Sequence, residues 1–308
     1  MQNKRHPAPR LIAVGITVVV LAFMLSACSK PDPEIEFMAY DRAYDSKPFF
    51  ARVDHLYPLT DTVEARQQLA GVTPEYLASL DQEQVDQIYA RLTSGPIPDG
   101  AYEGDLFFAK GGSGKLRAAE IVGGLKGFAV RVKGEKLETL GKVLWKGKVF
   151  YRDEGVLRNR IEDLAILAPI IDDPLSVPKI DVDHRDAWLL FPGRLYCGQS
   201  LLDGRRESII IDYAFSDDIS GYREKPDYLA SRRGFQVRDE IRMIRPGFYL
   251  GRTYLGRAFA LNFTLYNEHV ANAGLEDWIQ TGESDEGCWI GNQRMAAAGM
   301  SRQESVRE

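Results

Sequence analysis

The stretch VRDEIRMIRPGFYLGRTYL, residues 237–255, decides the fold class of this chain. Residues 237–245 alternate with a period of two, the repeat of a β-strand, and the Pro-Gly pair at 246–247 suits a type II turn. The alternation places Val237, Asp239, Ile241 and Met243 on one face, and Arg238, Glu240 and Arg242 on the other. Either an aspartate points into an apolar core, or a row of charged side chains lines a functional site.

Further strands are predicted on both sides of this stretch. The segments with strand-like alternation or composition are 101–110, 141–151, 187–197, 207–215 and 259–266. In 141–151 the alternation sets Trp145 and Gly147 against Lys146 and Lys148, and in 187–197 a Pro-Gly pair predicts a bend or a hairpin. Short alternating strands separated by turn signals favour an antiparallel barrel or sandwich.

Residues 60–95 carry helical signals instead. Thr73 followed by Pro74 is the pattern of a helix cap and first turn, and Ser79 with Gln82 three residues later resembles a capping box. Apolar residues then recur at i, i+3, i+4 and i+7, namely Val85, Ile88, Tyr89 and Leu92. The sequence therefore predicts a short helical segment before the β domain.

Four motifs resemble a known family. They are GAYEG (100–104), LWKGKVFYRDEGVLRN (144–159), ESIIIDYAFSD (207–217) and VRDEIRMIRPGFYLG (237–251). They are similar to an uncharacterised family of bacterial exported lipoproteins, and distantly to the GXWXG domain with its C-terminal partner of unknown function. Tyr102 stands where that domain has tryptophan. The resemblance covers about residues 80–266 and implies a calycin-like antiparallel β-barrel, but no activity.

The N-terminus predicts export and lipidation. A basic start is followed by the uncharged apolar run Leu11–Met24 and then by Leu25-Ser26-Ala27-Cys28. This is the layout of a secretory signal, and the four residues that end it resemble the bacterial lipobox, in which the cysteine becomes the lipidated N-terminus. Ser29 after Cys28 then points to the outer membrane. The alternative is an uncleaved anchor helix, for which the apolar run is somewhat short.

The chain is acidic, and its charge limits the classes of partner that it is expected to bind. Removal of residues 1–27 would leave 281 of the 308 residues and a net charge of −8. Nucleic-acid binding would need a basic stripe, so we expect no such partner. The expected parts are a signal peptide (1–27), a lipidated tether (28–59), a helical segment (60–95), a β-barrel domain (96–290) and a disordered tail (291–308).

Two cysteines remain after Cys28, namely Cys197 and Cys288. An even number of cysteines in an exported chain predicts a disulfide between them. The alternative is a pair of unpaired, buried thiols.

No cofactor or metal site is predicted. The motif GGSGKL (111–116) lacks the first glycine and the final hydroxyl of a phosphate-binding loop, so a hairpin loop is the better interpretation. The histidines His55, His184 and His269 lie at no ligand spacing. The acidic motif DVDHRD (181–186) is expected to be a solvated turn rather than a cation site.

The charged residues around 237–252 admit two interpretations. Asp212 and Asp239 each lie inside an apolar strand run, where an unpartnered carboxylate would be costly. A carboxylate–guanidinium network could hold the strands in register, because arginine forms planar two-bond pairs. Alternatively, the same residues form the polar end of a cavity that binds a ligand carboxylate or phosphate. The candidate residues are Asp212, Tyr213, Arg238, Asp239, Glu240, Arg242, Tyr249 and Arg252.

Asp239 carries the sharpest structural prediction. It falls between Val237 and Ile241 on the apolar face, so we expect it to be largely buried. The expected partners are Arg238, Arg242 or Arg252, or a residue of the strand 207–215.

The predicted function is non-catalytic. We expect a lipid-anchored periplasmic β-barrel that binds a small amphipathic molecule or acts as an envelope structural or interaction module. The alternative is a hydrolase or isomerase that uses Asp239, Glu240 and Tyr249 as acid and base at the barrel mouth. The expected partners are the membrane, through the N-terminal lipid, and an amphipathic small molecule; the oligomeric state is left open.

Overall fold

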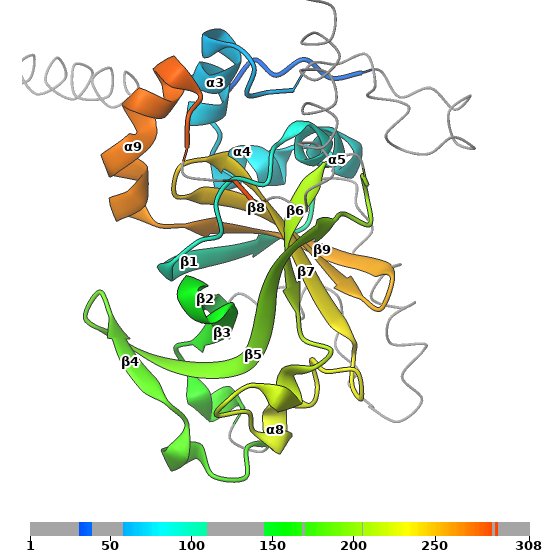
Figure 1. Cartoon of the computed structure of the whole chain (residues 1–308), viewed down its shortest axis with the longest axis vertical. Helices are drawn as coiled ribbons and strands as arrows, with labels where there is room; N and C mark the ends of the chain where they lie inside the picture. The colour runs from blue at the N-terminus through cyan, green and yellow to red at the C-terminus, as the bar shows by residue number, and fades with distance from the viewer. Residues whose placement is uncertain are drawn as a thin grey trace, which may run out of the picture. The chain divides into compact units, whose positions relative to one another are not determined.

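The fold is mainly β, as predicted. A computed structural model of the protein describes residues 31–38, 58–109, 145–167, 170–204, 206–284 and 287–288. The elements described below belong to one compact unit that begins at Glu34. Helices α3, α4, α5 and α9 gather at one end of this unit, and α8 lies at the other (Figure 1).

The strands are β1 Gly100–Phe107, β2 Trp145–Tyr151, β3 Val156–Ile161, β4 Lys179–Val182, β5 Arg185–Gln199, β6 Glu207–Asp212, β7 Val237–Arg245, β8 Phe248–Leu255 and β9 Ala258–Tyr266. The helices are α3 Val63–Ala70, α4 Pro74–Ser79, α5 Gln82–Arg91, α8 Glu224–Asp227 and α9 Glu268–Thr281. Short 3-10 turns are η2 Arg152–Glu154, η3 Leu164–Ile166, η5 Pro174–Ser176 and η6 Ser216–Asp218.

The sheet closes on itself. Within the described residues its order is β3-β2-β1-β9-β8-β7-β6-β5-β4, and β3 also pairs with β5. Every pairing is antiparallel. The β3–β5 pairing closes eight strands into a barrel, and β4 pairs with β5 outside this barrel. Neighbours along the chain are mostly neighbours in the wall, and β9 returns to β1 to complete it. The predicted calycin-like antiparallel barrel is therefore confirmed.

The β7–β8 hairpin forms where its sequence predicts it. Arg245 pairs with Phe248 across the turn, and Gly247 has a φ of 71°. A type II turn requires a positive φ at its third residue, and glycine adopts it without steric cost.

The Pro-Gly pair of 187–197 marks a bend rather than a hairpin. Residues Arg185–Gln199 form one long strand, β5, which curves strongly between its partners (Figure 1). Its first residues, 185–188, pair with β4, residues 188–194 pair with β3, and residues 194–199 pair with β6. A single bent strand thus takes part in both halves of the barrel wall.

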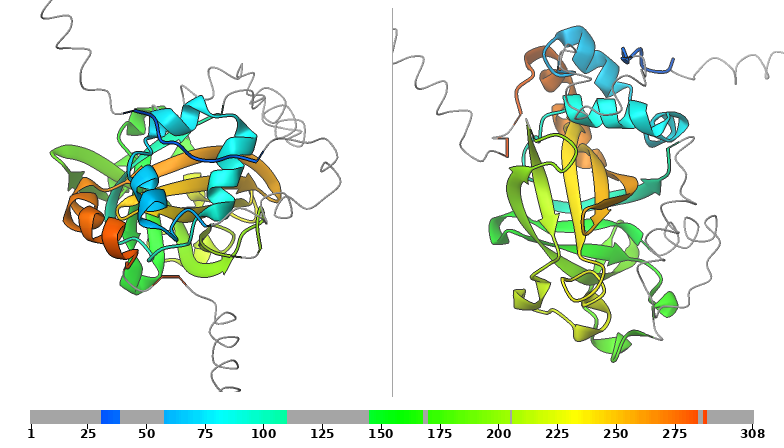
Figure 2. Two further views of the ribbon diagram at one scale, coloured as in Figure 1. Left: turned by 90° about the horizontal axis from the view of Figure 1, so that it is seen from above. Right: turned by 90° about the vertical axis from the view of Figure 1, so that its right-hand side faces the viewer.

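The predicted helical segment consists of three short helices. Thr73 caps α4 with Pro74 in its first turn, as expected. The predicted capping box at Ser79 and Gln82 is wrong, since Ser79 ends α4 and the capping box of α5 is formed by Asp81 and Gln84. The α5 stripe is buried as predicted, because this helix packs onto the outer face of the barrel wall. Figure 2 shows the helices covering one end of the barrel.

Helix α9 has no counterpart among the elements predicted from the sequence. Asn267 caps its N-terminus by accepting a hydrogen bond from the Val270 N–H. Its buried residues include Ala271 and Trp278, and the Arg66 guanidinium of α3 donates to the Ile279 carbonyl near its C-terminal end at 2.7 Å. The seven-residue spacing of Ala271 and Trp278 is compatible with a helix, but the strands predicted before it gave no reason to expect one here.

A short stretch of the predicted tether is bound to the helices. Within Glu34–Met38, the Glu34 N–H donates to the Gln68 side chain at 2.7 Å. The Gln87 amide accepts from the Met38 N–H at 2.8 Å and donates to the Met38 carbonyl at 3.1 Å. These bonds hold the backbone of the segment against α3 and α5, and its Ile35 side chain is buried in the core.

The two cysteines pair as predicted. The sulfur atoms of Cys197 on β5 and Cys288 lie at disulfide distance, 2.01 Å. The Cys288 N–H also donates to the Gly95 carbonyl at 2.8 Å, and its carbonyl accepts from Ser94 Oγ at 2.9 Å. Cys288 is therefore attached to β5 by a covalent bond and to the segment between α5 and β1 by two hydrogen bonds.

Candidate functional site

Both faces of β7 are buried, so both of its sets of charged residues have a role inside the protein. Asp239 points into the barrel lumen, together with Ile241 and Met243. Glu240 and Arg242 point outward, where helix α5 and the loop between β5 and β6 cover them. Two separate polar networks follow from this alternation.

The lumen holds a cluster of four polar side chains: Lys148 from β2, Asn159 from β3, Tyr213 directly after β6, and Asp239 from β7. Three other strands lie between β2 and β7 in the sheet on one side. Lys148 and Asp239 can therefore meet only across the lumen. Lys148 is 2% exposed and Asp239 is 4% exposed, so the pair is shielded from water.

Lys148 is the centre of this lumen cluster. Its Nζ donates to Asn159 Oδ1 at 2.8 Å, to the Tyr213 hydroxyl at 2.7 Å and to Asp239 Oδ2 at 2.9 Å. An ammonium group has three protons and no acceptor. Each proton of the charged lysine therefore has an acceptor within the cluster.

The acidic side of the cluster is equally well satisfied. Asp239 Oδ2 also accepts from the Tyr213 hydroxyl at 3.1 Å, and Oδ1 accepts from Thr253 Oγ1 at 2.7 Å. Both carboxylate oxygens thus have donors, which is the condition under which a buried charge is tolerated.

The Asn159 amide is held from both of its ends. Its Oδ1 accepts from Trp145 Nε1 at 2.9 Å in addition to the lysine. Its Nδ2 donates to the Phe191 carbonyl at 2.9 Å and to the Tyr213 hydroxyl at 3.0 Å. These partners fix which atom of the amide faces Lys148.

Aromatic rings enclose the cluster. Lys148 Nζ lies 5.4 Å from the ring centroids of Trp145, Tyr213 and Phe263, a distance at which a cation is attracted to a ring face. The Trp145 and Phe263 rings pack edge to face, 5.6 Å apart. Gly104 and Gly251 make this possible, since a Cβ at either position would collide with one of these two rings.

Burial shifts the protonation equilibria of the cluster. Desolvation lowers the pKa of Lys148, and the charge and hydrogen bond of Asp239 oppose that shift. Desolvation also raises the pKa of Tyr213 well above its ordinary value, and the Asp239 charge adds to the increase. Tyr213 therefore keeps its proton at neutral pH and donates it to the carboxylate.

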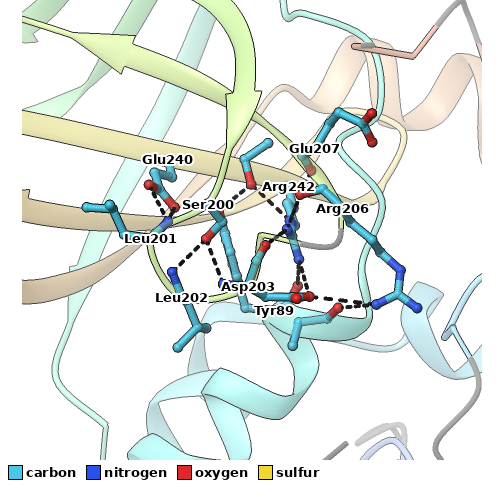
Figure 3. A network of polar contacts seen from close by, with 11 residues as sticks. Tyr89, Ser200, Leu201, Leu202, Asp203, Arg206, Glu207, Glu240 and Arg242 are labelled. Carbon is cyan, nitrogen blue, oxygen red and sulfur yellow. Dashed lines mark hydrogen bonds and ion pairs between the residues drawn. The ribbon is translucent and has the colours of Figure 1, made fainter. Parts of the chain in front are cut away.

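The outward face of β7 carries the second network, centred on Arg242 (Figure 3). The Arg242 guanidinium is fully buried, and it donates to four backbone carbonyls and to Ser208 Oγ. The carbonyls belong to Tyr89 at 2.9 Å, Asp203 at 3.1 Å, Arg206 at 2.8 Å and Glu207 at 3.1 Å. Arg242 thereby joins α5 to the loop between β5 and β6.

Glu240 binds the same loop from the neighbouring position on this face. Its carboxylate accepts from the Leu201 N–H at 2.9 Å and from Arg238 Nε at 3.0 Å, and Figure 3 shows it bonded to Leu201. On β8, Arg252 pairs with Asp86 of α5. The outward charges are therefore occupied with holding helix and loop against the wall.

The burial predicted for Asp239 is confirmed. The predicted arginine partner is wrong, but the predicted partner from residues 207–215 is present, because the Tyr213 hydroxyl donates to Asp239 Oδ2. The ion-pair partner of Asp239 is Lys148. Arg238 and Arg242 lie on the opposite face of β7, and Arg252 sits opposite Glu240 in the register and shares that outward face. Strand alternation therefore keeps these three arginines out of the lumen.

Lys148 and Asn159 were missed by the sequence analysis for a local reason. Simple alternation places Lys148 on the face opposite Trp145. A β-bulge between Trp145 and Gly147 shifts the register, so both side chains reach Asn159. A lysine such as Lys148 in a strand run of mostly apolar residues indicates a buried charge. A β-bulge, however, reverses the face that alternation assigns to it.

The remaining predicted residues do not join the lumen cluster. Asp212 accepts from the Tyr196 hydroxyl at 3.0 Å at the surface. The Tyr249 hydroxyl donates to the Pro96 carbonyl at 2.8 Å. Asp239 and Glu240 face opposite sides of the wall, so the three residues considered for acid–base catalysis do not converge on one site.

Fold and site together define a closed eight-stranded antiparallel barrel whose lumen holds a buried lysine–aspartate pair. Comparisons with protein-family models and with curated proteins find no match, so the family resemblance stays a prediction. A crystal structure of a protein from Thermomonospora curvata is similar, with a TM-score of 0.34 and 16% identity. That match covers 66% of this chain and 97% of the other; the fold assignment rests on the strand pairing itself.

The described residues contain neither a helix suited to cross a membrane nor a cluster of metal ligands. No helix in this part of the chain has the length and apolar character needed to cross a membrane. No group of three or more histidine, cysteine or acidic residues there is arranged to hold a metal ion. The motif GGSGKL and the predicted lipidation site Cys28 lie outside the described residues.

Proposed function

We propose that this protein is a lipid-anchored, periplasmic outer-membrane module whose barrel is a non-catalytic scaffold for structural or interaction purposes in the cell envelope. The observation that carries the proposal is the mutual saturation of the lumen cluster. The three protons of Lys148, both oxygens of Asp239 and both ends of the Asn159 amide have partners within the wall. A catalytic acid or base needs a free position toward its substrate.

Lipid anchoring is the first part of the proposal to test, and it rests on Leu25-Ser26-Ala27-Cys28. We expect Cys28→Ser to release the protein from membranes or to leave it unprocessed, which fractionation and intact mass measure. Ser29→Ala, beside the cysteine, is the matched control and should still be anchored. A Cys28→Ser protein that fractionates like the wild type and has no altered processing would contradict the anchor.

A second candidate function is the binding of a small amphipathic molecule. The observation in its favour is that Trp145, Thr253 and Leu261, which lie on the lumen side of the wall near the cluster, are only half-buried. A ligand reaching them would find aromatic surface beside one charged group, which is the usual composition of a small-molecule site.

Native mass spectrometry of protein purified from its own envelope separates the two functions. The scaffold proposal predicts that no small molecule stays bound in stoichiometric amount. A bound molecule that is lost from Lys148→Met, while circular dichroism shows an unchanged fold, would overturn the scaffold in favour of ligand binding. Lys146→Met, on the same strand, is the control and should behave as the wild type.

A further inference from the structure

The lumen cluster brings three reactive groups together: an amine, a primary amide and a carboxyl. Lys148 Nζ lies 2.8 Å from Asn159 Oδ1 and 2.9 Å from Asp239 Oδ2. Lys148 and Asn159 are also direct partners in the β2–β3 register. We propose that Lys148 and Asn159 form an intramolecular isopeptide bond, with Asp239 as the acid–base group.

The reaction balances without any other reactant. The Lys148 ammonium passes one proton to Asp239, and the free amine attacks Cγ of Asn159. A bond forms between Nζ and Cγ, and the tetrahedral centre then loses its bond to Nδ2. Asp239 takes a second proton from Nζ and supplies one to Nδ2, so the nitrogen leaves as ammonia and Asp239 ends protonated. The product is a neutral amide in place of an ion pair.

Each proton transfer has a hydrogen bond along which it can run. Asp239 contacts Nζ directly, and the Tyr213 hydroxyl lies 3.1 Å from Asp239 Oδ2 and 3.0 Å from Nδ2. Tyr213 therefore links the acid to the leaving nitrogen. Proton transfer by positioned groups of this kind is an established source of rate acceleration.

Trp145 supplies the stabilisation that the tetrahedral centre needs. Its Nε1–H already donates to Asn159 Oδ1 at 2.9 Å, and this oxygen becomes negatively charged when the amine attacks. A fixed donor aimed at a developing oxyanion is worth more in a dry site than in water. Burial of Lys148 also lowers the pKa of its amine, which favours the nucleophilic form.

Asn159 is the better acceptor than the aspartate for a chemical reason. Condensation of Lys148 with Asp239 would lose water and would consume the acid–base group. Among the described contacts of Lys148, Asp239 is the carboxyl that remains to serve the reaction with Asn159. The cross-link would join β2 to β3, which in turn pairs with β5, and it would reinforce the wall.

Peptide mapping of the wild-type protein tests the proposal directly. After reduction and trypsin digestion, we expect no cleavage after Lys148. The peptide Gly147–Arg152 should be joined to the peptide that contains Asn159, with a mass one ammonia below the sum of the two. Separate peptides with complete cleavage after Lys148 would overturn the proposal, and so would a linkage to Asp239 with loss of water.

Variants assign the roles. Lys148→Arg and Asp239→Asn should each give the two peptides uncoupled, whereas Lys146→Arg, which changes a nearby lysine outside the lumen cluster, should keep the link. A link that persists in Asp239→Asn would refute the role of Asp239. The wild-type result does not depend on the folding of any variant, and it is independent of the anchoring and ligand tests.

Discussion

Asp239→Ala is expected to lower the free energy of unfolding by about 3–5 kcal/mol, because it leaves the Lys148 ammonium buried without its carboxylate. The pair is 2.9 Å apart, with both side chains almost fully removed from water. A loss of this size is a large part of the roughly 5–15 kcal/mol that stabilises a typical domain. Urea unfolding followed by circular dichroism measures it. The variant also prevents the proposed cross-link, which adds to the loss.

Two further variants show whether the charge itself is responsible. Asp239→Asn keeps the shape and some hydrogen bonds and should lose less. The double variant Asp239→Ala/Lys148→Met should recover part of the lost stability, because it removes the unpaired cation. Two results would contradict a buried ion pair. One is an Asp239→Ala protein with an unchanged unfolding midpoint. The other is a double variant whose loss of unfolding free energy equals the sum of the losses in Asp239→Ala and Lys148→Met.

Arg242→Met should destabilise the protein by a similar amount, about 3–5 kcal/mol. Methionine fills much of the space but donates nothing. Two buried and two part-buried backbone carbonyls therefore lose a donor, and each buried unsatisfied group costs on the order of 1–3 kcal/mol before relaxation. Arg242→Lys should recover little of the lost stability, because an ammonium group has three donors and cannot replace the planar guanidinium, which has five.

The matched control for Arg242 is Arg232→Met. Arg232 pairs with Asp217, but half of its side chain is exposed. An exposed ion pair contributes on the order of 0–1 kcal/mol, so the control should change stability little. Hydrogen exchange should show that Arg242→Met loosens α5 and the loop between β5 and β6. Equal effects of the two variants would refute the structural role of Arg242.

Much of the fold could be predicted because it depends on local pattern. The strands around 237–255 alternate regularly, and Pro246-Gly247 supplies the turn between them. The α5 stripe follows helical spacing and is buried where predicted. Helix α9 was not predicted, since its apolar positions lie in a part of the chain that followed a long series of strands.

The site was harder to predict than the fold. Asp239 could be assigned to the lumen because a period of two fixes the face on which a side chain lies. Its neighbours across the lumen could not be assigned in the same way. The sequence favoured arginines near Asp239 along the chain, whereas the structure supplies a lysine 91 residues away.

The sequence by itself determined the strand pattern, the β7–β8 turn, the burial of Asp239 and the pairing of Cys197 with Cys288, because each depends on local periodicity, turn chemistry or residue count. Only the tertiary structure decided that Lys148 is the partner of Asp239. The two residues lie on strands that are not neighbours in the wall, so they meet only when the sheet closes. The bulge at Gly147 then turns Lys148 inward, and neither closure nor the bulge leaves a periodic signal along the chain.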